Sequence, residues 1–250
     1  MLTKRLCYLT IMLVLGSQVA FGQKKLTDEQ IIAHLQNRLF HAKVYDHGKV
    51  EVAYKDGVAT LTGTVDSLGV KMDAEKAARK IEEVTQVVNN LNVHAEDVTM
   101  RQIFEQARKQ ILTYYAYSIF DWITLEGAGS KLVVNGYVSQ PYKKPDIGYF
   151  LAHIKGVADL QNNLEVLPVS NFDDDIRIAV ARAIYNDPFF ITYASMANPP
   201  IHIVVKGGNV TLEGVVNSQG EKTKAETNAR FAETFFNLTN NLQVEGRQPR

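Results

Sequence analysis

The chain has one cysteine, one tryptophan and no net charge at pH 7. The cysteine, Cys7, precedes an apolar run instead of following it, so it is poorly placed for lipidation, and the rest of the chain has no thiol for a disulfide. A domain of this composition depends on its hydrophobic core alone. The balance of 27 basic and 27 acidic residues argues against non-specific nucleic-acid binding, which needs a strongly basic surface.

The apolar run Leu6–Leu15 is also short, at about half of the roughly 20 residues that a helix needs to cross a bilayer. Two basic residues precede it, and the small residues Ala20 and Gly22 follow it, an arrangement typical of a secretory signal peptide. The sequence therefore predicts a signal peptide over residues 1–22, cleaved near Gly22, and export of the remainder. The alternative is an uncleaved segment that stays as an N-terminal anchor.

An internal repeat is the strongest feature that is present. Three segments each carry a glycine in a strand-like run and, 28 residues later, the leucine of an Asn-Asn-Leu triplet. The pairs are Gly63 and Leu91, Gly136 and Leu164, and Gly214 and Leu242. Because the glycines are 73 and then 78 residues apart, the constant internal spacing indicates one unit joined by connections of variable length.

Each unit has the same predicted order of elements. A capped helix comes first, as Thr27 with Gln30 and Thr99 with Gln102 indicate. Two strands follow around a turn such as Asp56-Gly57, and then a second helix and a last strand. We therefore expect an α+β protein of three repeated α-β-β-α-β two-layer sandwiches, each a three-stranded mixed sheet covered by two helices. The predicted units span residues 25–95, 98–168 and 171–246, and such small units are expected to pack partly on one another.

The glycine near the strand end, the alanine-rich second helix and the closing Asn-Asn-Leu-x-Val together resemble the BON domain family. Residues 56–65 match the usual sequence motif of the family best, and residues 210–216 match it nearly as well. The middle unit matches it least, at its hairpin. The resemblance implies an OsmY-like periplasmic protein with three BON repeats. It also implies phospholipid binding, a part in osmotic or envelope stress, and support of outer-membrane integrity. Three units instead of two, and no well-placed lipidation cysteine, are departures from known members.

Catalytic, metal and cofactor sites are not expected. The histidines have no zinc-site spacing, and His34 and His41 stand two helical turns apart, too far to share one metal ion. The acidic run 173–175 could resemble an oxygen-ligand site, but charge at a helix N-terminus is the simpler interpretation. We therefore predict no enzymatic activity. The six histidines are His34, His41, His47, His94, His153 and His202.

Two groups of side chains are candidate lipid or partner contacts. Aromatic residues at the end of the first helix of the middle unit suit a membrane or protein interface, with packing as the alternative. In that packing alternative, Tyr115 and Phe120 are the residues expected in the core. Basic residues on the second helix of the first unit could meet lipid phosphates, although a solvated face is the alternative because glutamates dilute them. The candidates are Tyr114, Tyr117 and Trp122, and Lys76, Arg79 and Lys80.

The three repeated glycines, Gly63, Gly136 and Gly214, are expected to meet a backbone or packing need and not to bind a ligand. The predicted function is that of a non-enzymatic periplasmic binding protein that contacts a phospholipid membrane surface and supports envelope integrity or the response to stress. The alternative is a periplasmic protein–protein scaffold that binds envelope proteins and no lipid.

Overall fold

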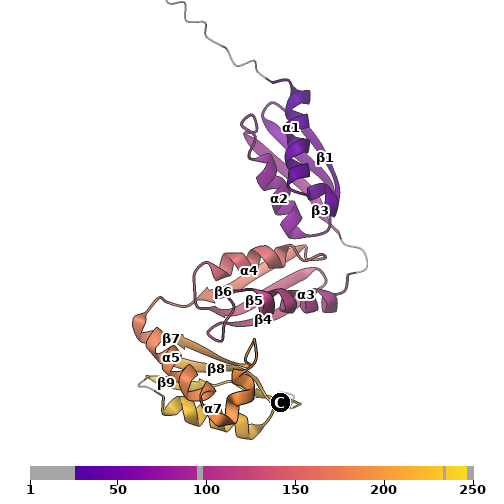
Figure 1. The fold of residues 1–250 in the computed structure, drawn as a ribbon. Coiled ribbons are helices and arrows are strands. Elements are labelled where there is room, and N and C mark those ends of the chain that lie inside the picture. The colour runs from indigo at the N-terminus through magenta and orange to yellow at the C-terminus, as the bar shows by residue number, and fades with distance from the viewer. Residues whose placement is uncertain (1–25, 95–97, 233–234, 247–250) are drawn as a thin grey trace, which may run out of the picture.

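The computed structural model describes residues 26–94, 98–232 and 235–246, which form three α/β modules arranged as an elongated stack (Figure 1). The first module contains α1 (Asp28–His41), the 3₁₀ turn η1 (Val44–His47), β1 (Gly48–Lys55), β2 (Val58–Val65), α2 (Leu68–Ala78) and β3 (Gln86–Val93). The second contains α3 (Met100–Thr113), β4 (Trp122–Ala128), β5 (Lys131–Val138), α4 (Lys143–Ala152) and β6 (Asp159–Val166).

The third module repeats this order with additions. It contains α5 (Asn171–Tyr185), β7 (Ile201–Lys206), β8 (Asn209–Val216), α7 (Gln219–Arg230) and a last strand split into β9 (Asn237–Asn240) and β10 (Gln243–Val244). Between α5 and β7 it inserts η2 (Pro188–Phe190) and the short helix α6 (Ile191–Ala194). The coarse α+β prediction is confirmed, whereas the insertion and the split strand depart from a strictly uniform repeat.

Each sheet is mixed, with the second strand of each module at its centre. β2 pairs antiparallel with β1 and parallel with β3, and β5 does the same with β4 and β6. β8 pairs antiparallel with β7 and parallel with both β9 and β10. The helix that follows each central strand provides the long crossover that a parallel neighbour requires.

Side-chain caps fix the helix starts. Thr27 and Thr99 form capping boxes with Gln30 and Gln102, and Ser170 accepts a hydrogen bond from the backbone of Asp173. Each first helix then buries one residue per turn against its sheet. These residues are Ile31, Leu35 and Leu39; Ile103, Ala107 and Ile111; and Ile176, Val180 and Ile184. Three separate hydrophobic cores result, one in each module.

The repeated glycines lie where the outer strand crosses the central strand closely. Gly63 has φ +116°, and a Cβ atom there would lie 2.1 Å from the carbonyl oxygen of Lys49. Gly136 and Gly214, both at φ +124°, approach the carbonyl oxygens of Trp122 and Pro200 in the same way. An L side chain at these positions meets both backbone strain and a steric clash.

The first asparagine of each Asn-Asn pair joins the last strand to the second helix. The Nδ2 atoms of Asn89, Asn162 and Asn240 donate to helix carbonyl oxygens at 2.9, 2.9 and 3.1 Å. Each Oδ1 atom accepts from the backbone N–H two residues later. Asn89 and Asn162 lie within β3 and β6, so they do not cap the turn into the last strand.

The first and second modules are joined by backbone and side-chain contacts. Leu68 N–H donates to the Val157 carbonyl at 2.8 Å, and Gly156 N–H donates to the Asp66 carbonyl at 2.9 Å. The imidazole Nε2 of His153 lies 2.9 Å from Asp73 Oδ2. These contacts place α2 beside α4, where the two modules meet in Figure 1.

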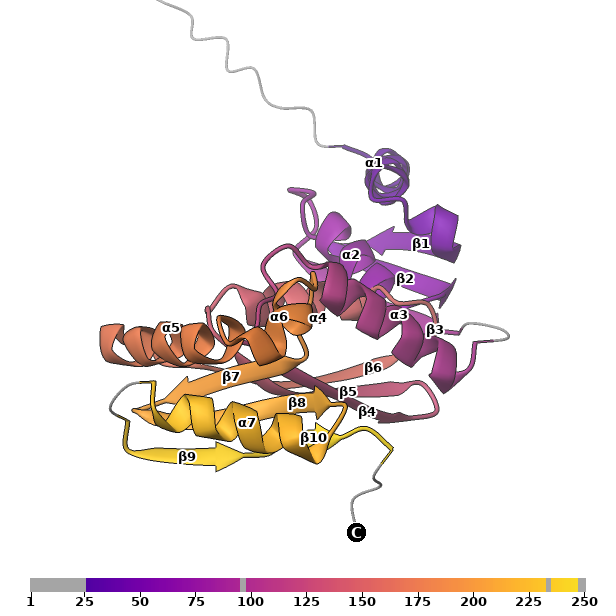
Figure 2. The ribbon, with the colours of Figure 1, turned by 60° about the horizontal axis from the view of Figure 1, so that its bottom comes forward.

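The second and third modules meet through their sheets, which lie close together in Figure 2. Residues Ile201–Val205 of β7 are buried on both faces of the strand, although the helices of the third module cover only one face of its sheet. Ile203 N–H donates to the Ile119 carbonyl at 2.7 Å, and Lys206 Nζ lies 2.6 Å from Glu165 Oε1 on β6. The second module therefore covers the outer face of β7. Among the described residues, no helix is long and apolar enough to cross a membrane, and the predicted signal peptide lies outside them.

Candidate functional site

The predicted aromatic cluster is divided between the core of the second module and its boundary with the third. Tyr114 packs against the second core, and its hydroxyl donates to Asp146 Oδ2 at 2.7 Å. Burial, reinforced by the Asp146 carboxylate, raises the pKa of Tyr114. This tyrosine is therefore held by its own module and does not present a free hydroxyl to a partner.

Tyr117 and Trp122 surround a histidine of the third module. Their ring centroids lie 5.7 and 5.2 Å from that of His202, which is buried. Burial lowers the pKa of His202 from its ordinary value, and burial likewise raises the pKa of Tyr117. The two rings that we expected to face a membrane are half-buried at a contact between modules.

The packing alternative is wrong for Tyr115, because its side chain is 86% exposed beyond the C-terminus of α3. Phe120 is half-buried, but it packs against the core of the third module and not that of its own. The helix pattern does not extend past Thr113, so the periodicity that predicts burial in α3 gives no guidance for the loop that follows.

The predicted basic residues on α2 do not form one continuous site. Arg79 is ion-paired with Glu75 at 2.7 Å, whereas Lys76 is exposed. Lys80 lines a hollow of about 550 Å³ between the ends of α1 and α2, together with His34, Asn37, Arg38, His41, Ile81, Glu82 and Glu83. The hollow mixes both signs of charge, so it offers no concentrated positive surface.

A buried ion pair in the second module has no signal in the local sequence. Lys143 Nζ lies 2.7 Å from Asp121 Oδ2, and both side chains are almost fully buried. Asp121 also accepts hydrogen bonds from the backbone and hydroxyl groups of Ser118 and Ser139. Because every oxygen of the carboxylate is engaged, this network anchors the loop before β4 and is not a free catalytic group.

The acidic run at the start of α5 has an unexpected role. Asp173 is buried, and its carboxylate accepts hydrogen bonds from the backbone of Gly207 and Gly208 at 2.8 and 2.7 Å. It therefore holds the turn between β7 and β8 in addition to lying at a helix N-terminus. Within the described ranges, no group of three or more His, Cys, Asp or Glu residues is arranged to hold a metal ion.

Exposed apolar side chains gather in the third module instead of the second. Phe172 is 48% exposed at the first turn of α5, and its ring centroid lies 6.0 Å from that of Phe236, which is 76% exposed. Phe231, the C-cap of α7, is 86% exposed, and α7 ends at this same end of the module (Figure 2). We call Phe172, Phe231 and Phe236 the phenylalanine end.

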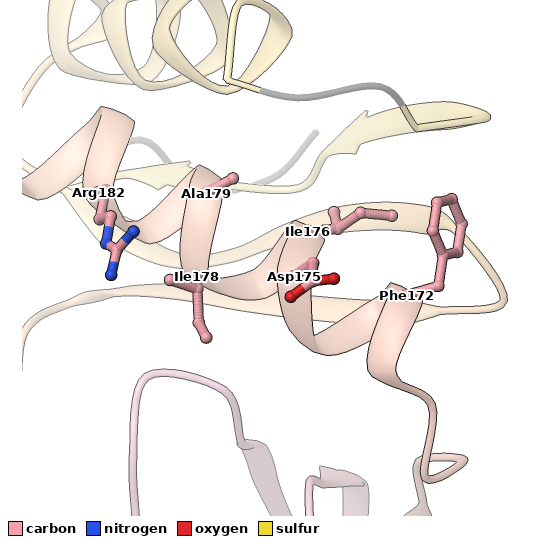
Figure 3. A pocket seen from close by; sticks show the side chains of 6 residues that line it. All are labelled: Phe172, Asp175, Ile176, Ile178, Ala179 and Arg182. Atoms are coloured by element: carbon pink, nitrogen blue, oxygen red, sulfur yellow. The ribbon is translucent and has the colours of Figure 1, made fainter.

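A shallow hollow of about 370 Å³ begins at Phe172 and follows α5. Figure 3 shows Asp175, Ile178 and Arg182 projecting from one side of the helix along this hollow. Asp175 and Arg182 are seven residues apart, or about 10 Å along a helix. The hollow therefore presents one carboxylate and one guanidinium beside an apolar end.

A second groove lies between α3 and the outer edge of β4. Its volume is about 500 Å³, and the third module contributes to its wall. Sequence reasoning identified Tyr117 and Trp122 but missed the groove, because its other walls come from a helix and from a different module. The lining residues are Phe104, Arg108, Ile111, Leu112, Tyr117, Trp122, Ile123, Thr124, Leu125, His202 and Val215.

Comparison with known families identifies the modules. The model of the BON domain matches residues 27–95 and 173–246, which is more than half of the chain. The chain belongs to the BON domain family. The matched segments are the first and third modules; assignment of the middle module as a further BON copy rests on its shared topology and on the repeated glycine and asparagine. BON domains are non-catalytic, and membership is consistent with an envelope-associated role.

Individual relatives add little about the role of this BON protein. An uncharacterized protein in the gshII 5′ region of Anaplasma centrale is 31% identical over 78 residues, which are 31% of this chain and 50% of that protein. The chain thus spans half the length of this curated relative. Two structures of CdsD, a structural protein of the type III secretion system of Chlamydia trachomatis, align over 84% of this chain and 96% and 91% of theirs, at 13% and 14% identity. Their TM-score of 0.25 is too low to support any inference.

Proposed function

We propose that this BON protein is a non-enzymatic, peripheral membrane-binding protein of the periplasm, in which the third module contacts the phospholipid surface and supports envelope integrity under stress. The phenylalanine end carries the proposal. Three exposed phenylalanine rings at one end of a module are costly to leave in water and gain free energy on entering the lipid interface.

The charge distribution favours apolar over electrostatic contact. The chain as a whole is neutral, and near the phenylalanine end Arg230 is already paired with Glu226 at 2.7 Å. Lys206 is likewise paired with Glu165. The opposite charges of Asp175 and Arg182 beside Phe172 suit a zwitterionic headgroup better than an anionic one. We therefore place the proposed membrane contact here and no longer at Tyr117 and Trp122.

Vesicle flotation tests this proposal with phosphatidylcholine vesicles and with vesicles that also contain phosphatidylglycerol. The protein is expected to float with both compositions. Phe231→Ser combined with Phe236→Ser should lower the bound fraction by more than about tenfold, since burying each ring is worth over 1 kcal/mol. Phe40→Ser is the matched control, because Phe40 is 66% exposed on the first module.

Three outcomes would contradict the proposal. Flotation that survives the double substitution places the contact elsewhere, and flotation with anionic vesicles alone shows that charge dominates. Absence of flotation with either composition leaves the protein–protein scaffold as the better account of this BON protein.

A further inference from the structure

The free edge of the third module's sheet is closed by its own side chains and by one carbonyl of the second module. In β7, the backbone groups of Ile201, Ile203 and Val205 point away from β8 and would otherwise be unpaired. Tyr185 Oη donates to the Ile201 carbonyl at 2.5 Å and accepts from its N–H at 3.2 Å. Arg177 Nη2 donates to the Val205 carbonyl at 2.7 Å. As described above, the Ile203 N–H is also paired, so this edge has little capacity left for another strand.

The corresponding edge of the second module is open. Gly136 pairs with Ile123 as Gly214 pairs with Ile201, so Ile123, Leu125 and Gly127 of β4 correspond to the three edge residues of β7. No hydrogen bond closes these positions from outside the sheet in the described part of the chain.

The helix residues that close β7 have apolar counterparts beside β4. Counting from the core residues Ile103 and Ile176, Phe104 replaces Arg177 and Leu112 replaces Tyr185. Neither replacement can donate to a backbone carbonyl.

The groove of about 500 Å³ follows this open edge. Four consecutive residues of β4, from Trp122 to Leu125, line it, so it meets the edge of the strand and not one face. A further hollow of about 430 Å³ continues along α3 past Met100 and shares Phe104 and Arg108 with the groove. Met100 in turn contacts the position of Gly127, because a Cβ atom there would lie 3.0 Å from its methyl group.

We propose that an extended peptide segment of another protein binds in this groove as an additional strand on β4. Unpaired backbone donors and acceptors along an apolar trench are what strand addition requires. An acyl chain would cover the same polar backbone groups without pairing them. The groove is walled by α3 and, from the third module, by His202 and Val215, so it suits one strand and not the sheet edge of a second copy.

The groove also specifies the chemistry of the peptide. Alternate side chains would face Phe104 and Ile111, so these positions should be apolar. Arg108 is exposed at the rim and makes no ion pair with a described residue, so a carboxylate near one end of the peptide should bind more tightly than an amide. β4 has seven residues, which sets the length of the matching segment.

The test uses the full chain and a panel of labelled seven-residue peptides in a fluorescence anisotropy titration. The peptides alternate threonine with valine, isoleucine or phenylalanine and end on glutamate. Each peptide is also made in two methylated forms. One form carries N-methyl groups on the backbone nitrogens of the odd-numbered residues, and the other carries them on those of the even-numbered residues. One methylated set should lower affinity at least tenfold, because it blocks the edge that pairs with β4, while the other set leaves it unchanged.

A protein variant tests the same site from the other side. Leu112→Tyr introduces a hydroxyl where Tyr185 closes β7, at a position that is already 40% exposed, and should weaken the best peptide at least fivefold with an unchanged melting temperature. Phe40→Tyr makes the matching change on α1 and should have no effect.

Four results would overturn the proposal. The first is that no peptide of the panel binds with a Kd below about 1 mM, and the second is that the two methylated sets bind with equal affinity. The third is that a fatty acid binds more tightly and displaces the peptide. The fourth is that the protein forms a dimer that Leu112→Tyr dissociates. None of these results depends on vesicle flotation, so the strand-addition site and the phenylalanine end can fail independently.

Discussion

The imidazole of His202 lies 5.2 Å from the indole of Trp122, measured between ring centroids, and this contact joins the third module to the second. The indole is the only one in the chain, so its fluorescence reports this boundary alone. Burial lowers the pKa of His202, and it outweighs the opposite influence of the nearby Asp121 and Ser118, so the net direction is downward.

We predict that acid weakens this boundary. Because the pKa of His202 is lowered in the folded protein, the unfolded chain binds more protons between the ordinary value of 6.5 and the folded value. The contribution of His202 to the free energy of unfolding is therefore fully present above about pH 7, and it is lost as the pH drops through that window. Calorimetric melting from pH 7.5 to 4.5 should show a larger loss for the native chain than for His202→Phe, which cannot titrate.

Emission from Trp122 provides a second measurement of the same event. Acid should shift it to the red as the boundary opens, and the shift should be smaller in His202→Phe. Identical pH profiles for the two proteins would mean that other titratable groups, which are unchanged in the variant, account for the whole dependence.

The buried pair of Asp121 and Lys143 predicts a large effect of a single substitution. Lys143→Met leaves a fully buried carboxylate without its cation and should lower the free energy of unfolding of the second module by about 3–5 kcal/mol. Arg79→Met breaks an exposed pair and should cost less than about 1 kcal/mol.

Urea unfolding of the single variants and of Lys143→Met with Asp121→Asn tests this argument. The double variant should recover part of the loss, because the buried charge is removed. A loss under 1 kcal/mol for Lys143→Met alone would show that the serines around Asp121 suffice to stabilise it.

Local patterns in the sequence were enough to predict the repeated helices and strands of each module, but not the insertion of η2 and α6 or the split last strand of the third. The capping boxes at Thr27 and Thr99 mark helix starts, and the Asp56-Gly57 turn has the positive φ angles, 48° and 86°, of a tight hairpin. These signals lie within a few residues of one another, so they survive in any tertiary context.

Contacts between modules could not be predicted in this way. His202 alternates with Ile201 and Ile203, so the strand pattern places it on a solvent face, and only the neighbouring module makes that face buried. Asp121 and Lys143 are 22 residues apart and belong to a loop and a helix, so no spacing rule connects them. Aligning the repeats position by position would have revealed Phe104 and Leu112 opposite Arg177 and Tyr185.

Gly69 and Gly220 occupy equivalent positions at the start of α2 and α7, and they predict opposite results on replacement by alanine. A Cβ atom on Gly69 would lie 2.3 Å from Nδ1 of His153, so Gly69→Ala should push this ring away from Asp73 and loosen the first module from the second. Gly220 has only Ser218 Oγ nearby, at 3.7 Å, so Gly220→Ala should stabilise its helix by about 0.5–1 kcal/mol.

Small-angle X-ray scattering tests the effect of Gly69→Ala on the arrangement of the modules. The variant should have a larger radius of gyration than the native chain with unchanged circular dichroism, and Gly220→Ala should match the native chain in both. An unchanged radius for Gly69→Ala would mean that His153 finds another position without separating the modules.

The repeated glycine gives the most direct test of how the sequence specifies each module. Gly63→Val combines a positive φ angle with a side chain directed at the Lys49 carbonyl, so it should lower the free energy of unfolding of the first module by about 2–5 kcal/mol. Gly129→Asn is the control: Gly129 also has positive φ, +61°, but no atom lies within 4 Å of an added Cβ, and asparagine tolerates this conformation. Thermal melting should show a marked fall for Gly63→Val and almost none for Gly129→Asn. Equal melting temperatures would mean that β1 can shift away from β2 at little cost, and that the spacing of 28 residues is not set by this close approach.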